Sequence, residues 1–259
     1  MATQIHLHAE PGDYAPVVLI PGDPNRATRM AARLDGGLDA TRLVNQNRGL
    51  LGYTGTLDGV PISVQATMMG APTTSIVMEE LLNLGCTTFI RVGTTGGYRG
   101  THLGDVVVAL AAAAHIGIGA ILGDGEATAP TADWDVVNAL VAASRAAGLT
   151  THVGPIVTSD VFYDPNPLGA IRWGARGYLS AEMESAAVFL LAMRERAKGR
   201  PVRAGTILTV SDVILDPGEV AEGAPAQAGW ERLPEDELQR RIDLTIGAAL
   251  SAGVELGRN

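Results

Sequence analysis

The stretch "TTSIVMEELLNLGCTTFIRVGTTGG", residues 73–97, decides the fold. In its first half, apolar residues recur at helical spacing from Ile76 to Leu84, and Gly85 supplies a helix stop. The second half contains a short apolar run, "TTFIRVG", which is typical of a buried strand. A helix followed directly by a buried strand predicts one unit of an α/β fold.

The same alternation continues in both directions along the chain. Strand-like runs occupy residues 16–20, 104–110, 151–160 and 204–212, and a hairpin with an Asp-Gly turn occupies residues 53–67. Helical patterns occupy residues 25–34, 133–148, 183–199 and 234–253. We therefore expect a single α/β domain over residues 1–259, with a central mixed, largely parallel sheet flanked by helices. Residues 215–229, rich in Gly, Ala and Pro, are interpreted as a long loop of the kind that forms lids.

Composition excludes several classes of protein. Hydrophobic residues make up 46% of the 259 and charged residues 18%, which argues against disorder. The formal net charge of −9 argues against a nucleic-acid partner, which would need a basic patch. A small anionic ligand stays possible, because a few arginines can hold one inside an acidic protein.

The single cysteine, Cys86, cannot form a disulfide within the chain, which fits a reducing compartment. No signal peptide and no membrane-spanning run is evident, so we expect a cytoplasmic protein without a membrane partner. No His, Cys or Asp cluster has metal-ligand spacing, and neither G-x-G-x-x-G nor a Walker P-loop is present. The sequence thus predicts no metal and no nucleotide cofactor.

Polar side chains gather where the predicted strands end, which is where open α/β sheets bind ligands. These positions are Gly22, Asp23, Arg26, Met68, Met69, Gly70, Arg91, Thr94, Thr95, Gly96, Ser159, Asp160, Phe162, Glu182, Met183, Glu184, Ser211 and Asp212. The set combines cations, hydroxyls, small residues, an aromatic ring and acids.

Arg91 interrupts an otherwise apolar strand, and a buried arginine needs an anionic partner. The Gly-Thr-Thr-Gly-Gly sequence after it is interpreted as a glycine-rich turn that ends the strand, and it offers N–H groups and hydroxyls suited to a phosphate. The alternative is an internal carboxylate such as Glu79 or Glu80.

Glu182 and Glu184 flank one methionine before a helical pattern. An irregular stretch there could aim Glu184 at a sugar, whereas the alternative is simple capping of the helix. Asp212 ends a strand, so it is either a general acid or a turn residue.

Four motifs together resemble the nucleoside phosphorylase family of the bacterial hexameric type. They are "PGDPNRA", "NRGLLGYTG", "RVGTTGG" and "AEMESAA", and the similarity runs in family order from "HLHAEPGD" to Asp212. The family includes purine nucleoside phosphorylases and uridine phosphorylases.

The resemblance implies roles for individual residues. The implied phosphate-binding residues are Gly22, Arg26, Arg91, Thr94 and, from a neighbouring subunit, Arg48. The implied ribose contacts are Met69, Met183, Glu184 and the neighbour's His6. The implied base-binding residues are Thr95, Gly96, Phe162, Glu182, Ser211 and Asp212, with Asp212 as the catalytic acid.

The implied reaction is phosphorolysis, in which phosphate attacks C1′ of a nucleoside and releases the base and ribose 1-phosphate through an oxocarbenium-like transition state. Phosphate is a co-substrate, and no cofactor is implied. The Ser-Asp pair at 211–212, and the absence of a Gln after Phe162, favour purine over uridine. Thr94-Thr95 resembles the uridine enzymes, which keeps that alternative open. A nucleosidase and a non-catalytic nucleoside-binding module are further alternatives.

The family's enzymes are hexamers built from dimers with shared active sites. The resemblance therefore implies a homo-oligomer of this kind. It also implies a supporting arginine for Asp212, for which Arg232, Arg240 and Arg241 are candidates.

Overall fold

The computed structural model describes residues 4–98, 100–164, 169–214 and 230–258. Its strands are β1 (Val17–Pro21), β2 (Arg42–Asn45), β3 (Gly52–Leu57), β4 (Val60–Gln65), β5 (Thr88–Gly97), β6 (Val106–His115), β7 (Thr151–Ser159), β8 (Ser180–Glu182), β9 (Arg203–Ile214) and β10 (Trp230–Arg232). Its helices are α1 (Pro24–Ala31), α2 (Ala71–Asn83), α3 (Gly117–Leu122), α4 (Trp134–Ala146), α5 (Gly169–Ala175), α6 (Ser185–Ala197) and α7 (Glu235–Arg258), with a short 3₁₀ turn at Asn47–Gly49.

All described strands join one mixed sheet in the order β10-β9-β6-β7-β8-β5-β1-β4-β3-β2. Its middle is parallel, because β1 pairs with β4 and β5, and β5 pairs with β9. Since β9 pairs with both β5 and β6, the sheet curls back on itself through β6, β7 and β8. The predicted α/β fold with a mixed sheet is confirmed.

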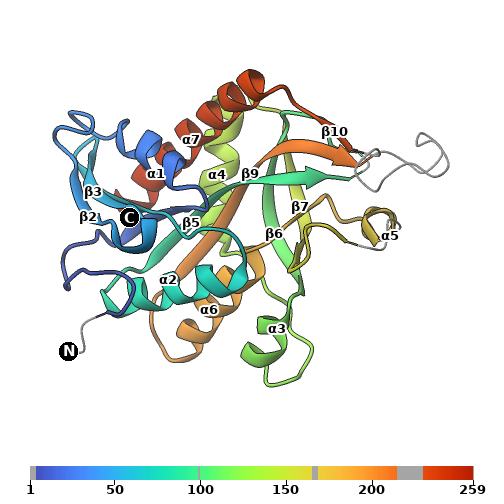
Figure 1. The fold of residues 1–259 in the computed structure, drawn as a ribbon, viewed down its shortest axis with the longest axis horizontal. Coiled ribbons are helices and arrows are strands. Elements are labelled where there is room, and N and C mark those ends of the chain that lie inside the picture. The colour runs from blue at the N-terminus through green and yellow to red at the C-terminus, as the bar shows by residue number, and fades with distance from the viewer. Residues whose placement is uncertain (1–3, 99, 165–168, 215–229, 259) are drawn as a thin grey trace.

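Helices cover both faces of the sheet and form two hydrophobic cores (Figure 1). One core packs α1, α4 and α7 against the sheet, with Met30, Leu140 and Ile246 fully buried. The other packs α2 and α6 against the opposite face, with Met78 and Phe189 fully buried. The carboxyl ends of the parallel strands lie between these layers, and the loops leaving them build the candidate site.

The Gly-Thr-Thr-Gly-Gly segment differs from expectation. We predicted a turn, but β5 continues through Gly97, pairing with β9 and antiparallel to β8. The glycines are needed because side chains crowd the strand: a Cβ on Gly93 would lie 2.8 Å from Arg91 Nη2, and one on Gly96 would lie 2.9 Å from Asp212 Oδ2. Tertiary pairing thus overrides the local turn signal, and glycine makes room for two functional side chains.

The two glutamates before α6 have different roles in the structure. Extended β8 ends at Glu182, a bend follows, and α6 begins at Ser185 with Glu184 at the N-cap position. The side chain of Glu184 makes no capping hydrogen bond, whereas Glu182 accepts the N–H of Ser185, the first residue of α6, so helix capping describes Glu182 and not Glu184. The loop expected at residues 215–229 lies outside the described residues.

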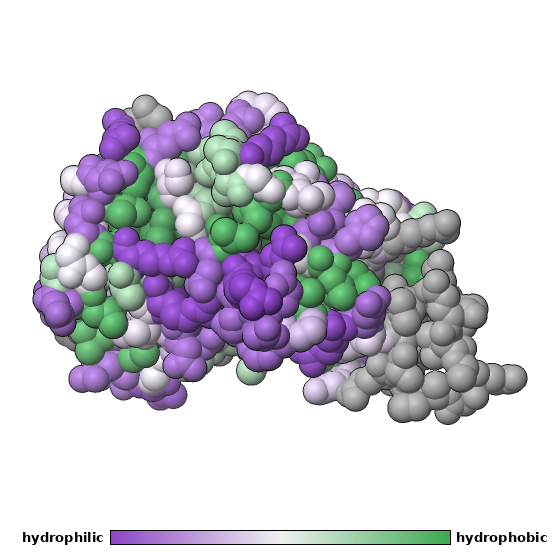
Figure 2. Space-filling view, turned by 90° about the horizontal axis from the view of Figure 1, so that it is seen from above, coloured by the Kyte–Doolittle hydropathy of each residue, from purple (hydrophilic) through white to green (hydrophobic). Residues whose placement is uncertain are grey.

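The solvent face of α7 is charged. Figure 2 looks onto the top of Figure 1, where α7 lies, and hydrophilic residues form a band across that face. On α7, Arg240 pairs with Asp236 and Glu237, and Asp243 pairs with Arg29 of α1 and with Arg33 just after that helix. Exposed pairs of this kind are each worth about 0–1 kcal/mol, so α7 is held mainly by its buried face.

One stability prediction follows from the close approach of β9 to α4. A Cβ added at Gly205 would overlap Val136 Cγ1, because the strand backbone lies against that helix. We expect Gly205→Ala to lower the free energy of unfolding by about 1–3 kcal/mol, as overpacking does. Gly247→Ala is the control: Gly247 is exposed on α7, and its Cβ would meet only Arg33 Nη1 at 3.6 Å. That variant should gain about 0.5–1 kcal/mol from helix propensity, and equal urea midpoints for both would contradict the argument.

Candidate active site

A buried arginine between two glutamates forms the centre of the candidate site. Arg91 on β5 donates from Nε to Glu182 Oε2 at 2.8 Å, and its Nη2 lies 2.5 Å from Glu184 Oε2. All three side chains are at most 6% exposed. Burial would lower the pKa of Arg91, but the charges of Glu184 and Glu182 outweigh it and raise that pKa. Arg91 therefore stays cationic, and its pairing with Glu79 or Glu80 is excluded.

The carboxylate of Glu184 connects the loop before α2 with the segment that leads into α6. Its Oε1 accepts the Gly70 N–H at 2.7 Å, and its Oε2 accepts the Met183 N–H at 3.1 Å. Burial raises the pKa of Glu184, Arg91 opposes that effect, and the charge of Glu182 adds to it. Glu184 thus holds two backbone N–H groups and the Arg91 guanidinium at once.

Glu182 differs from expectation, because it faces protein rather than an open base site. Its Oε1 accepts from Thr158 Oγ1 at 2.5 Å, while the N–H groups of Glu184 and Ser185 donate to Oε2 at 2.9 Å each. With the bond from Arg91, the carboxylate is filled and its side chain is 1% exposed. The expected contact between Glu182 and a base is therefore corrected.

Arg26 approaches the same cluster from the start of α1. It is 9% exposed, and Nη1 donates to the Val92 carbonyl at 3.2 Å, while Nε is buried without a hydrogen-bond partner. Burial lowers the pKa of Arg26 to about 10, partly offset by Asp23, and the charge of Arg91 lowers it further. The guanidinium is thus protonated at neutral pH. Gly22 lies beside it, where a Cβ would be 2.9 Å from the Met68 carbonyl oxygen.

Asp212 lies on β9 beside the glycine-rich end of β5. Its Oδ1 accepts from Ser211 Oγ at 2.7 Å, and the same hydroxyl lies 3.3 Å from the Thr95 carbonyl oxygen. A register shift between Thr95 and Gly96 brings Gly96 opposite Asp212. Asp212 as a residue is 8% exposed, and it lies within the paired strand β9 rather than in a turn.

Strand β10 places Arg232 opposite Asp212 and Trp230 opposite Ile214. Arg232 is the antiparallel register partner of Asp212, and such pairs present their side chains on the same face of the sheet. Arg240 and Arg241 instead pair with acids of α7, so of the three candidates Arg232 is the one that strand register places opposite Asp212. Phe162, half exposed, makes an edge-on contact with Trp230 with ring centroids 5.3 Å apart.

The sequence also matches a model of a known protein family, and the matched region contains the site just described. A model described as the phosphorylase superfamily matches residues 16–232, which include both site arginines, both glutamates and Asp212. The chain belongs to the phosphorylase superfamily. The family resemblance noted in the sequence is thereby confirmed.

Relatives in the phosphorylase superfamily carry specific names. A purine nucleoside phosphorylase DeoD-type from an Exiguobacterium species is 36% identical over 254 residues, which are 97% of this chain and 98% of the relative. One of the same name from Roseobacter denitrificans is 39% identical, covering 86% of this chain and 91% of the relative. A guanosine phosphorylase from Halorubrum lacusprofundi is 36% identical, covering 96% and 98%.

Within this phosphorylase chain, two predicted residues lie away from the arginine cluster. His6 donates or accepts at Nδ1 with Glu80 Oε1 at 2.8 Å, and Glu80 also accepts the N–H groups of His6 and Leu7. Burial would raise the pKa of Glu80, but these hydrogen bonds lower it. Arg48 is exposed, in the left-handed region with φ 56°. Among the described residues, no hydrogen bond joins either one to Arg26 or Arg91.

Four further predicted residues lie on the same elements as the arginine cluster or on the loops next to it, namely Met69, Met183, Thr94 and Thr95. Met69 is 80% exposed in the loop before α2, where Met68 has φ 60°. Met183 is partly buried beside Glu184, and Thr94 is partly buried on β5. The hydroxyl of Thr95 donates to the Ala181 carbonyl at 2.7 Å, which directs it into the protein.

Sequence reasoning missed Thr158 on β7, although it named the next two residues, Ser159 and Asp160. Thr158 is fully buried, and it holds Glu182 while accepting the Ala186 N–H at 2.9 Å. Strand alternation could have signalled that only one of two neighbouring hydroxyls faces inward.

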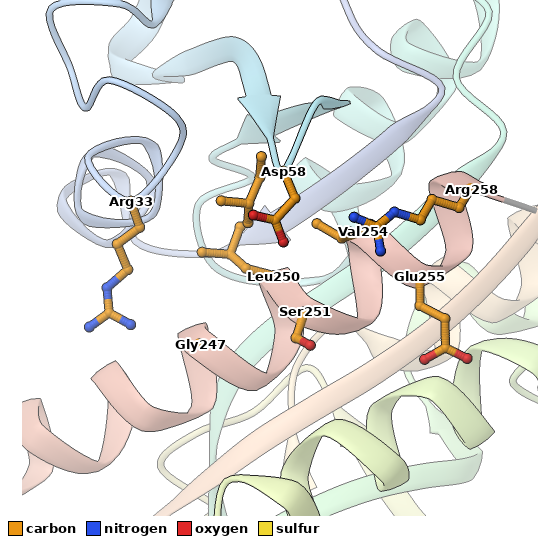
Figure 3. Close-up of a pocket in the computed structure, with 9 residues that line it drawn as sticks. Arg33, Asp58, Gly247, Leu250, Ser251, Val254, Glu255 and Arg258 are labelled. Atoms are coloured by element: carbon orange, nitrogen blue, oxygen red, sulfur yellow. The ribbon is translucent and has the colours of Figure 1, made fainter.

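An open hollow elsewhere in this phosphorylase shares no residue with the cluster. Its volume is about 620 Å³, and it lies between α7, α1 and the β3–β4 hairpin (Figure 3). Its lining residues are Arg33, Leu57, Asp58, Gly247, Leu250, Ser251, Val254, Glu255 and Arg258. None of these was a predicted site residue.

Two further properties concern the described residues alone. They contain no group of three His, Cys, Asp or Glu side chains suited to a metal ion. None of the helices in that part of the chain combines the length and the apolar character that a membrane span requires.

Proposed function

We propose that this protein is a purine nucleoside phosphorylase, which cleaves purine ribo- or 2′-deoxyribonucleosides with phosphate to give free base and (deoxy)ribose 1-phosphate. The observation that carries the proposal is Arg26 Nε, buried without a partner next to Arg91. Buried donors without acceptors are costly, and a phosphate oxygen would satisfy this one. The proposal treats residues 1–259 as one domain.

The chemistry follows from charge placement. A phosphate oxygen bonds to C1′ as the bond from C1′ to the base breaks, and that electron pair leaves with the base. Arg26, Arg91, Thr94 and Gly22 hold the phosphate below a sugar that becomes oxocarbenium-like. Glu184, with Met69 and Met183, holds the ribose. Asp212 gives its proton to the base nitrogen N7, so that the base leaves neutral.

The purine assignment is supported by Asp212 with its Ser211 partner and by the names of the relatives. Gly96 leaves space beside the carboxyl, and Phe162 with Trp230 offers an aromatic surface for the base. Thr95 was the residue that supported the uridine phosphorylase alternative. Its hydroxyl donates to the Ala181 carbonyl oxygen and is therefore already occupied within the protein. Arg232 is the proposed supporting arginine of Asp212.

The proposed active form is a cytoplasmic homo-hexamer built from three dimers. His6 and Arg48 lie apart from the cluster of their own chain, which fits their proposed role in a neighbour's site. Phosphate is the co-substrate, and no cofactor is part of the proposal. Sedimentation that shows a fully active monomer would contradict the shared site.

The direct test is a nucleoside panel assayed with and without phosphate. We expect inosine, guanosine or adenosine to release base only when phosphate is present, with ribose 1-phosphate as the second product. Release that ignores phosphate would make the protein a nucleosidase. Uracil released from uridine faster than any purine would favour the uridine alternative.

A further inference from the structure

We infer that Glu182 is the positioning residue that sets the orientation of Arg91, and thereby the affinity for phosphate. The inference rests on the proposed function. Glu182 was expected at the base, and neither the family match nor the names of the relatives assigns this carboxylate a task.

The contacts of Glu182 join three elements. Thr158 on β7 and the N–H groups of Glu184 and Ser185 at the start of α6 bond to its oxygens, and Arg91 on β5 donates to Oε2. Thr158 is itself tied to α6 by the Ala186 N–H. The carboxylate therefore has one geometry that satisfies all its donors, and it cannot swing toward a substrate.

The two glutamates use different nitrogens of Arg91. Glu182 takes Nε, at the inner edge of the guanidinium, whereas Glu184 takes Nη2. An Nε bond fixes the plane of the guanidinium, because the group is rigid and presents its donors in a fixed fork. Glu184 can release Nη2 when a sugar arrives, while Glu182 keeps the plane in place.

Charge and positioning predict opposite results for the loss of this carboxylate. If Glu182 acted only through its charge, its removal would make the site more positive and tighten phosphate binding. If it positions Arg91, its removal frees the guanidinium and weakens phosphate binding. The sign of the change therefore separates the two roles.

The test measures the dissociation constant of inorganic phosphate by calorimetry, together with KM for phosphate and for inosine. Glu182→Ala should weaken phosphate binding and raise its KM by roughly 10- to 100-fold, with KM for inosine changed much less. Glu182→Gln should stay within about threefold of wild type, because an amide oxygen can still accept from Nε. This rescue by the neutral amide also argues for geometry over charge.

Glu195→Ala is the matched control. Glu195 is another buried carboxylate of α6, 4% exposed, and it binds Lys198 and Arg200. It lies roughly 15 Å along the helix from Ser185, at about 1.5 Å per residue. We expect this variant to lose stability while its phosphate affinity matches wild type.

If Glu182→Ala does not fold, Thr158→Val takes its place. It removes the hydroxyl that bonds Glu182 Oε1, and phosphate affinity should fall by roughly 2- to 10-fold, with Thr158→Ser restoring it.

Phosphate affinity that is unchanged or tighter in Glu182→Ala overturns the inference, as does an equal loss for phosphate and inosine. Unchanged affinity in Thr158→Val overturns it in the fallback case. Wild-type protein that binds no phosphate would contradict the proposed function itself, and the inference with it.

Discussion

Asp212→Asn should lower kcat for inosine and adenosine by about 10²–10⁴-fold, the usual contribution of a general acid. Asparagine keeps the shape of the side chain and can still accept from Ser211 Oγ, but it has no proton to give to N7. Without that proton the purine must leave as an anion, which is a poor leaving group, so cleavage of the C1′–N9 bond is slower in the variant. Steady-state rates at saturating phosphate would measure the effect, and KM for phosphate should change little.

A substrate control separates proton donation from damage to the site. A 7-methylpurine nucleoside carries a cationic base, which leaves as a neutral molecule without any proton. Asp212→Asn should therefore cleave it at a rate near that of wild type. Equal losses on inosine and on the methylated substrate would show that Asp212 acts by another route. Asp133→Asn serves as protein control, since Asp133 holds Arg196 and the Ala204 N–H away from this chemistry.

Much of the fold follows from local patterns. The helix over residues 71–83 and strand β5 come from apolar periodicity, and the hairpin comes from Asp58-Gly59. Asp58 has φ 50° and Gly59 φ 76°, as a tight hairpin turn requires. In these three cases, residues close together in the sequence determine whether a segment is a helix, a strand or a turn. Sequence reasoning therefore succeeded.

The site was harder, because its pairings join distant residues. Arg91 finds Glu182 at a separation of 91 residues, so local reasoning considered Glu79 and Glu80 instead. Those two are occupied elsewhere, by Arg194 and by the N-terminal segment around His6. Choosing among carboxylates requires knowing which strand ends meet, and that depends on the whole sheet.

Two further features were beyond prediction from the sequence: where β5 ends, and which side chains of β7 face the interior. The glycines of β5 signalled a turn, yet pairing with β8 and β9 keeps the strand extended. On β7, a register shift of one residue would exchange Thr158 for Ser159 on the inner face. Tertiary context decides both questions.

Arg91→Met should have the largest effect on both stability and activity. It leaves Glu182 and Glu184 buried together without their cation, which typically costs about 3–5 kcal/mol. It also removes a cation that holds the developing charge near the phosphate, so kcat/KM for phosphate should fall by about 10²–10³-fold or more. Urea unfolding and steady-state kinetics would measure the two losses.

The pH dependence of that stability loss identifies its cause. Without Arg91, the pKa of Glu184, already raised by burial, should rise further, so the folded variant takes up a proton that the unfolded chain does not. An acid with a raised pKa in the folded state destabilises it most above that pKa, and the cost shrinks as pH falls. The gap between Arg91→Met and wild type should therefore narrow from about pH 8 to about pH 5. Arg194→Met is the control, since Arg194 also contacts two glutamates but is 34% exposed, and Glu195 keeps Lys198 and Arg200. A pH-independent gap for Arg91→Met would mean that lost packing, and not two uncompensated carboxylates, accounts for the instability.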